Sequence, residues 1–264
     1  MTLARDLLAL AEPIARDVGD HLRRSLAGAG PAITSKSTPT DLVTELDVWA
    51  EQHLVERLLA QRPDDGVLGE EGADRTGTSG VTWCIDPIDG TVNFVHRLPG
   101  FNVSVAALVD GRAVAGVVVS PLTGDTFTAV RDGGAHLDGT PIRCATPASL
   151  ARAVVGTGFA YDPARRTAQA EVLARVIGRI ADVRRLGAAA TDLCLVAAGR
   201  LDAYWEVGLN PWDHAAGALI AEEAGARVGA ISGGPPSERS VLAAPPAIWD
   251  ALAALLVEAG AEAV

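Results

Sequence analysis

The 264-residue chain has little of several residue types, and each scarcity excludes a kind of site or a class of protein. Aromatic residues make up only 4% of it, and Lys36 is the only lysine among 22 basic residues. Its three cysteines, Cys84, Cys144 and Cys194, lie far apart, with no CxxC or Cys/His cluster of the kind that binds zinc. Such spacing is typical of buried thiols in a reducing compartment, so we expect a cytoplasmic protein.

Long hydrophobic runs and excess positive charge are also missing. Acids and arginines interrupt the first 22 residues every few positions, which predicts neither a signal peptide nor a membrane span. The net charge of −11 repels nucleic-acid phosphates and anionic lipids, so we expect neither as a partner. A chain this acidic that handles phosphates needs metal ions to reverse the local charge.

A composition of 48% hydrophobic and 21% charged residues is that of a globular protein with a real core. Hydrophobic periodicity predicts helices at 3–27 and 41–62 (capped by Thr40 or Asp41), a mobile polar loop at 28–40, strands at 66–72 and 81–86, and an antiparallel meander at 101–142. After residue 146 strands and helices alternate up to residue 225. We therefore predict an α+β half (1–145) and an α/β half (146–264) that pack as one unit.

Carboxylates stand where the predicted strands end. Glu70 and Glu71 end one strand, and Asp86 ends the next, followed by Asp89. Oxygen ligands of this kind suit Mg²⁺. Pro87 fixes the backbone between the aspartates, which would let the Ile88 carbonyl point inward as a further ligand.

The next residues, Gly90 and Thr91, open a predicted helix whose free N–H groups suit a phosphate. Each of these features alone has an ordinary explanation. A DxxDG segment is more often a turn, and a Glu pair is more often solvated. Asp213 could be a simple helix N-cap, and Asp47 a solvent-facing acid on its helix.

Two segments together resemble the signature motifs of the inositol monophosphatase family. The first is WCIDPIDGTVNFVH (83–96) and the second is WDHAAGALIAEEAG (212–225). Segments such as SKSTPTDLVTELD and GAAATDLCLVAAGRLDAYWE resemble the family in the same order, so the resemblance covers nearly the whole chain. It implies a mixed α/β fold, the layered αβαβα sandwich, and a homodimer.

The resemblance also implies a two- to three-ion Mg²⁺ site, with lithium sensitivity. Its ligands would be Glu70, Asp86, the Ile88 carbonyl, Asp89 and Asp213. A metal-activated water would attack the phosphorus, with Asp47, Glu70 and Thr91 as the catalytic residues. Lys36 resembles a loop lysine near the metals.

The substrate contacts that the resemblance implies are Asp89, Gly90, Thr91, Arg184, Gly187, Ala188, Ala189, Glu206 and Asp213. Glu206 would accept hydrogen bonds from ring hydroxyls. We expect His96 and His214 to be structural and Trp83, Trp205 and Trp212 to pack in the core. Phe159 departs from a serine that some members place against the inositol ring, and Arg97 from a common glycine.

The leading hypothesis is a Mg²⁺-dependent phosphatase acting on a phosphate monoester, myo-inositol 1-phosphate or a similar polyol phosphate. Histidinol phosphate, fructose 1,6-bisphosphate and 3′-phosphoadenosine nucleotides remain alternatives, although the sequence has no clustered Arg or Lys to bind a second phosphate. A non-catalytic role, as a regulatory module that binds a protein partner, stays open as a different class.

Overall fold

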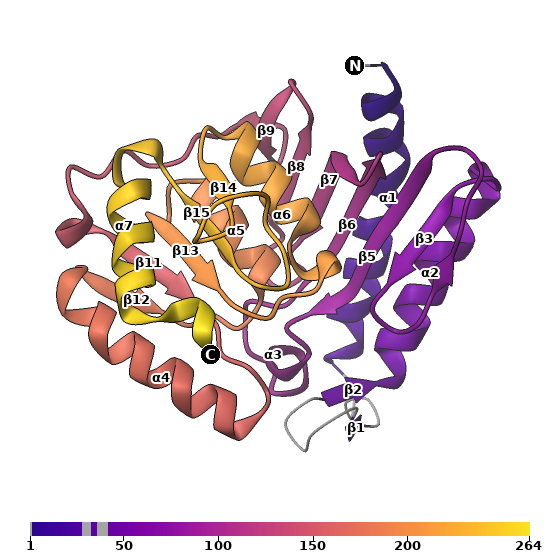
Figure 1. Ribbon diagram of the computed structural model, residues 1–264. Helices are drawn as coiled ribbons and strands as arrows, with labels where there is room; N and C mark the ends of the chain where they lie inside the picture. Colours follow the sequence, from indigo (N-terminus) through magenta and orange to yellow (C-terminus); the bar gives the residue numbers. More distant parts are fainter. Residues whose placement is uncertain (1, 28–32, 36–41) are drawn as a thin grey trace.

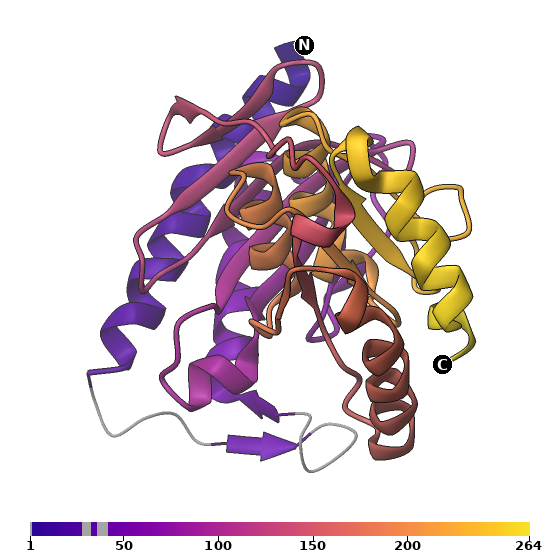
Figure 2. The ribbon, with the colours of Figure 1, turned by 90° about the vertical axis from the view of Figure 1, so that its left-hand side faces the viewer.

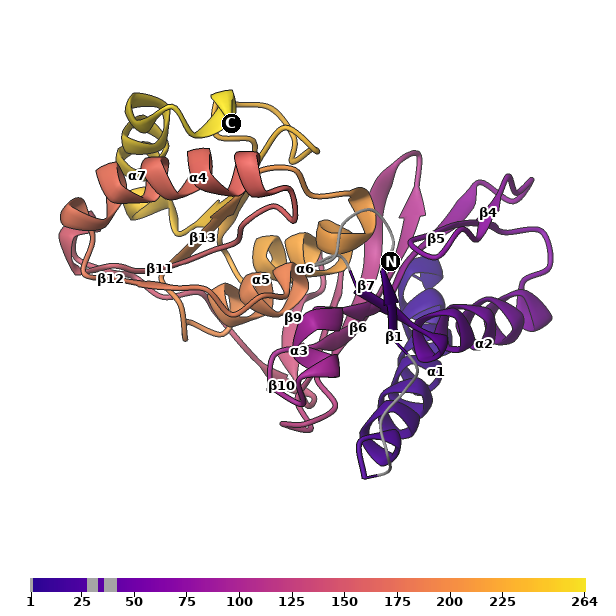
Figure 3. The same cartoon turned by 90° about the horizontal axis from the view of Figure 1, so that it is seen from below.

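A computed structural model of the chain describes residues 2–27, 33–35 and 42–264. Lys36 and most of the predicted loop at 28–40 lie outside these residues. The described elements stack in five layers, and Figure 3 shows them in order, as helices, sheet, helices, sheet and helices. The predicted layered αβαβα fold is confirmed.

The larger sheet has eight strands and contains the predicted meander. In spatial order they are β10 (Thr140–Pro141), β9 (Gly134–Leu137), β8 (Thr126–Val130), β7 (Arg112–Val119), β6 (Asn102–Val109), β5 (Val81–Asp89), β3 (Gly66–Gly69) and β4 (Asp74–Arg75). Strands β3 and β5 are parallel, with Gly69 beside Ile85. Because parallel strands end at the same edge, Glu70 and Asp86 emerge next to each other.

The smaller sheet has five strands and faces the larger one across a helical layer (Figure 1). Its order is β12 (Asp182–Arg184), β11 (Val154–Thr157), β13 (Ala203–Glu206), β15 (Val241–Ala244) and β14 (Arg227–Gly229). A separate two-stranded sheet pairs β1 (Ile33–Ser35) with β2 (Leu42–Thr44).

The helices fill the three remaining layers. They are α1 (Thr2–Ser25) and α2 (Glu45–Gln61) on the outer face of the large sheet, α5 (Ala189–Ala197) and α6 (Pro211–Glu223) between the sheets, and α4 (Pro163–Val176) and α7 (Pro246–Ala259) outside the small sheet. Figure 2 shows α4 and α7 side by side. The short α3 (Thr91–Val95) follows β5, and 3-10 turns lie at η1 (Leu150–Arg152), η2 (Ile177–Arg179) and η3 (Ala261–Ala263). Among the described helices, none combines the length and apolarity that a membrane span needs.

Side chains of the central strands alternate between two hydrophobic clusters. On β5, Trp83 and Ile85 pack against α1 and α2, whereas Cys84 joins the cluster around α5 and α6. This period of two buries both faces of the sheet. The strand is therefore held rigidly where its last residues enter the site.

Three local expectations were wrong. Helix α2 starts at Glu45 with Thr44 as its cap, rather than at Asp41, because residues 42–44 pair with β1 instead. Strand β5 continues beyond Asp86 to Asp89 through a register shift. Residues 33–35, placed in the predicted loop, form strand β1 because they pair with β2. No elements were predicted after residue 225, where β14, β15 and α7 lie.

Candidate active site

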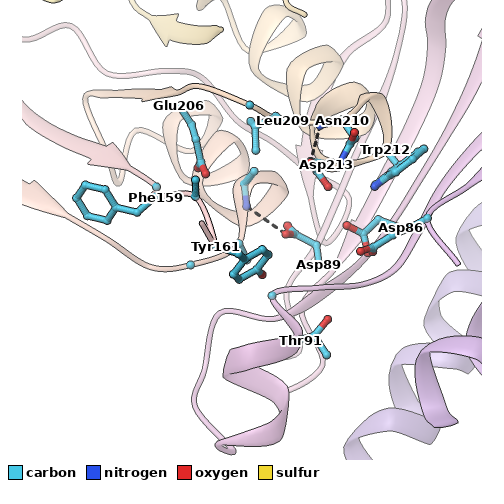
Figure 4. Close-up of a pocket in the computed structure, with 18 of the residues that line it drawn as sticks. Asp86, Asp89, Thr91, Phe159, Tyr161, Glu206, Leu209, Asn210, Trp212 and Asp213 are labelled. Atoms are coloured by element: carbon cyan, nitrogen blue, oxygen red, sulfur yellow. Dashed lines mark hydrogen bonds between the residues drawn. The ribbon is translucent and has the colours of Figure 1, made fainter. Parts of the chain in front are cut away.

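A pocket of about 430 Å³ opens where β3, β5 and β13 end and where α3, α5 and α6 begin. Six acids line it, and four of them are the expected metal ligands Glu70, Asp86, Asp89 and Asp213. Figure 4 shows three of them, Asp86, Asp89 and Asp213, on one side, with Phe159, Tyr161 and Glu206 on the other. The pocket thus has an acid-rich end and an end lined by Glu206 and two aromatic rings.

Asp89 is the most thoroughly anchored of these acids. Its Oδ1 accepts a hydrogen bond from the Ala189 N–H (3.2 Å), and its Oδ2 accepts from the Ala190 N–H (2.8 Å) and from Asn102 Nδ2 (2.7 Å). The two amides belong to the first turn of α5, where a negative charge is favourable. The carboxylate is thereby tied both to α5 and to β6.

Asp86 and Asp213 are positioned by their own backbone neighbours. The Ile88 N–H donates to Asp86 Oδ1 at 3.1 Å across the β5 irregularity. Asp213 is the third residue of α6, and its Oδ2 accepts from the N–H of Asn210 at 2.7 Å in a capping box. Asn210 is therefore the N-cap, a role that the simple interpretation gave to Asp213.

Burial and mutual repulsion raise the pKa values of these acids. Burial raises the pKa of Asp86 well above its usual value, and the nearby charges of Glu70, Asp89 and Asp213 raise it further. Burial also raises the pKa of Asp213 well above normal and that of Asp89 to about 7. These carboxylates favour the neutral form unless a positive charge joins them.

This donor set fits a hard divalent cation. Every side-chain ligand offered by the acid-rich end is an oxygen, and a cation would relieve the mutual repulsion of the carboxylates. Within the described parts of the chain, no three Asp, Glu, His or Cys side chains are placed so that they could hold a metal ion together. Binding an ion would therefore require these carboxylates to rotate toward one another.

Asp47 is fully buried, which excludes the ordinary explanation of a solvent-facing acid. Its Oδ2 accepts hydrogen bonds from the Thr44 N–H (2.8 Å) and hydroxyl (2.6 Å) as part of the α2 capping box. Thr91 Oγ1 lies 3.2 Å from Asp47 Oδ1 and 3.1 Å from the Ile88 carbonyl oxygen. Burial raises the pKa of Asp47, partly offset by the Thr44 hydrogen bonds.

Glu206 approaches the pocket from the end of β13. The buried Tyr204 hydroxyl donates to its Oε2 at 2.5 Å. On the other side, a Cβ added at Gly158 would overlap the carboxylate, so only glycine leaves room for it. Burial raises the pKa of Glu206, opposed by the Tyr204 hydrogen bond and by Arg185 and Arg165.

Of the substrate contacts that the resemblance implies, Arg184 alone does not line the pocket. Gly90, Thr91, Gly187, Ala188 and Ala189 line the pocket as expected.

Arg184 does not line it: this side chain is exposed and pairs with Asp182 at 2.7 Å. Its neighbour Arg185 lines the pocket instead, because residues alternate in direction along β12 and just beyond it.

Sequence reasoning missed several further lining residues, among them Tyr161, Arg165 and Arg185. No local pattern distinguishes these two arginines from the many others on the surface. Trp212, expected in the core, also lines the pocket, whereas Trp83 and Trp205 are buried as predicted. His214 is buried with its pKa lowered to about 4, and His96 is exposed.

Comparisons with known proteins agree with this arrangement. The model of the inositol monophosphatase family matches residues 4–261. The inositol-1-monophosphatase of Mycobacterium leprae is 48% identical over 245 residues, which cover 87% of this chain and 83% of that protein. The Nus factor SuhB of Escherichia coli K12 is 37% identical over 230 residues, 86% of each chain.

Among solved structures, the extragenic suppressor protein suhB of Bartonella henselae superposes with a TM-score of 0.90. It is 33% identical and covers 95% of this chain and 98% of its own. Fold and relatives define a phosphatase of the layered α/β class. The chain belongs to the inositol monophosphatase family, whose members are generally Mg²⁺-dependent.

Proposed function

We propose that this chain hydrolyses myo-inositol 1-phosphate to myo-inositol and phosphate. The observation that carries the proposal is the pocket itself, with Glu70, Asp86, Asp89 and Asp213 at one end and Glu206 at the other. The first end suits a phosphate with its metal ions, and the second suits hydroxyl groups. The name of the Mycobacterium leprae relative supports the choice of substrate.

Two to three Mg²⁺ ions would be held by Glu70, Asp86, the Ile88 carbonyl, Asp89 and Asp213. When bound, Mg²⁺ polarises the phosphoryl oxygens and lowers the pKa of water. Anchoring of Asp89 by two amides and Asn102 fixes one ligand before binding. This preorganisation limits the rotations that ion binding requires.

The Thr91–Asp47 pair would manage the proton of the attacking water. Thr91 Oγ1 accepts a hydrogen bond from the water while its own proton points to Asp47 Oδ1, 3.2 Å away. Asp47 is held by Thr44, so the pair keeps its direction. The raised pKa of Asp47 makes it a better proton acceptor than an ordinary aspartate.

The alcohol end would bind through Glu206, which accepts hydrogen bonds from ring hydroxyls. Tyr204 occupies Oε2 and leaves Oε1 for the substrate. Gly187, Ala188 and Ala189 form the adjoining wall, where small residues leave room for a six-membered ring.

The test is phosphate release, with and without Mg²⁺, from inositol 1-phosphate, histidinol phosphate, fructose 1,6-bisphosphate and a 3′-phosphonucleotide. We expect Mg²⁺-dependent release with preference for inositol 1-phosphate, inhibition by millimolar LiCl, and loss in Asp89→Asn. The absence of release from every substrate would reject the proposal. The homodimer implied by the family is checked separately by light scattering.

A second candidate is a regulatory role through a protein partner, favoured by the name of the Escherichia coli relative, Nus factor SuhB. Affinity capture with wild type and Asp89→Asn separates the two functions. A partner retained by the inactive variant would bind independently of catalysis.

A further inference from the structure

We propose that Arg165 and Arg185 form a subsite for a second phosphate group at the alcohol end of the pocket. The inference rests on the proposed phosphatase activity and extends its substrates to sugar or polyol phosphates that carry two phosphates. It also changes an expectation from the sequence, in which no basic residues cluster. The cluster forms only in three dimensions, from residues 20 positions apart.

The Arg165 side chain reaches the pocket from the first turn of α4. Asp162 caps that helix by accepting the Arg165 N–H at 2.8 Å, which sets the direction of the turn. The guanidinium lies against the backbone of Gly208, where an added Cβ would stand 2.6 Å from its Nη1. Because Gly208 is two residues beyond Glu206, the charge lies at the alcohol end.

Arg185 approaches from the other side, after β12 ends at Arg184. Its guanidinium covers Gly187, where an added Cβ would overlap Nη1. Gly187 and Gly208 both have positive φ (91° at each), so glycine provides the backbone shape as well as the space. Two separate elements thus bring a guanidinium to the same pocket wall.

Neither guanidinium forms an ion pair or hydrogen bond with a described residue, whereas neighbouring Arg184 is paired with Asp182. Both stand close enough to Glu206 to lower its pKa, against the effect of burial. Arg185 also lies close enough to the buried Asp192 to lower its pKa against the effect of burial. Among the described residues neither carboxylate accepts a hydrogen bond from these guanidinium groups, so their donors remain available to a ligand.

Guanidinium groups bind phosphate with paired, charge-assisted hydrogen bonds. A myo-inositol 1-phosphate molecule has no second anion to use them. The alternative is that both arginines serve only to keep Glu206 ionised. In that case they would help every polyol substrate equally, whether or not it carries a second phosphate.

Fructose 1,6-bisphosphate and fructose 1-phosphate differ only in the second phosphate, so the ratio of their kcat/KM values isolates its contribution. We expect this ratio, measured by initial phosphate release with Mg²⁺, to be about 10 in wild type, since charge-assisted hydrogen bonds are the stronger kind. In Arg165→Gln/Arg185→Gln it should fall to about 1. The control Arg152→Gln/Arg179→Gln removes the same charge from two exposed sites outside the pocket and should keep the wild-type ratio.

A wild-type ratio near 1, or an equal ratio in wild type and the pocket variant, would overturn the subsite. If inositol 1-phosphate is still hydrolysed in that case, the proposed function stands without it. A ratio that falls equally in the control would assign the effect to net charge and would also overturn the subsite. No release from any substrate would overturn both the function and the subsite.

Discussion

The buried hydroxyl of Tyr204 holds the carboxylate on which polyol recognition depends. Tyr204→Phe removes one hydrogen bond to Glu206 and leaves the ring in its cluster. Hydrogen bonds to charged groups contribute about 1.5–3 kcal/mol, so KM for inositol 1-phosphate should rise about tenfold with little change in kcat. Steady-state kinetics check this, with p-nitrophenyl phosphate, which has no ring hydroxyls, as the comparison substrate.

Adding the Tyr204→Phe change to a Glu206→Gln variant should have little further effect, because the two residues act through one hydrogen bond. If KM rose equally for both substrates, Tyr204 would be supporting the whole pocket rather than orienting Glu206.

A substitution at Gly158 tests whether Glu206 needs the free space beside its carboxylate. Gly158→Ala would place a methyl group on Glu206 and push it from its position, so KM for inositol 1-phosphate should rise about tenfold. The control is Gly178→Ala, where an added Cβ meets nothing within 4 Å and φ is not left-handed. Similar kinetics for the two variants would contradict this account of Glu206.

Among the elements, α2 supports the turn that carries Glu70. The buried Glu51 accepts hydrogen bonds from the Glu71 N–H (2.8 Å) and the Ala73 N–H (2.9 Å). Glu51→Ala removes both of these hydrogen bonds, which should loosen the turn. We expect the Mg²⁺ concentration for half-maximal activity to rise about tenfold, as is typical when the partners that support metal ligands are lost.

Glu56→Ala, on an exposed face of the same helix, is the matched control and should leave the Mg²⁺ dependence unchanged. Thermal unfolding of both variants separates loss of the turn from loss of the fold. A Glu51→Ala variant with wild-type Mg²⁺ dependence would show that α2 does not position Glu70.

For the molecule as a whole, the acid cluster links stability to pH and to Mg²⁺. In the metal-free state the pKa values of Asp86 and Asp213 are well above normal, and that of Asp89 is about 7. The folded state therefore binds more protons than the unfolded state between pH 4 and 7. The stability that these groups contribute is present at low pH and is lost as pH rises through about 7.

The increase in Tm on adding Mg²⁺ should consequently be larger at pH 8 than at pH 5, since protons and Mg²⁺ compete for the same oxygens. Melting curves in EDTA and in excess Mg²⁺ at both pH values measure this. Asp89→Asn should reduce the pH dependence. A larger increase at pH 5 would show that the carboxylates do not titrate together.

Local patterns were enough for most elements of the fold. Periods of two and 3.6 residues located the meander and most of the helices up to residue 225, and the two motif segments selected the layered fold. Local patterns did not predict the start of α2, which begins at Glu45 because residues 42–44 pair with β1. A strand this short has no periodicity of its own and forms only against its partner.

The acids of the candidate site could also be found from the sequence, because they occupy strand ends and helix starts that local patterns predict. The burial of Asp47 and the meeting of Arg165 with Arg185 could not. The first depends on how α2 packs beside Thr91 at the end of β5, and the second on how α4 lies beside the end of β12, so both bring together residues far apart in the chain. Side-chain contacts of this kind follow from packing between layers, and no local period encodes them.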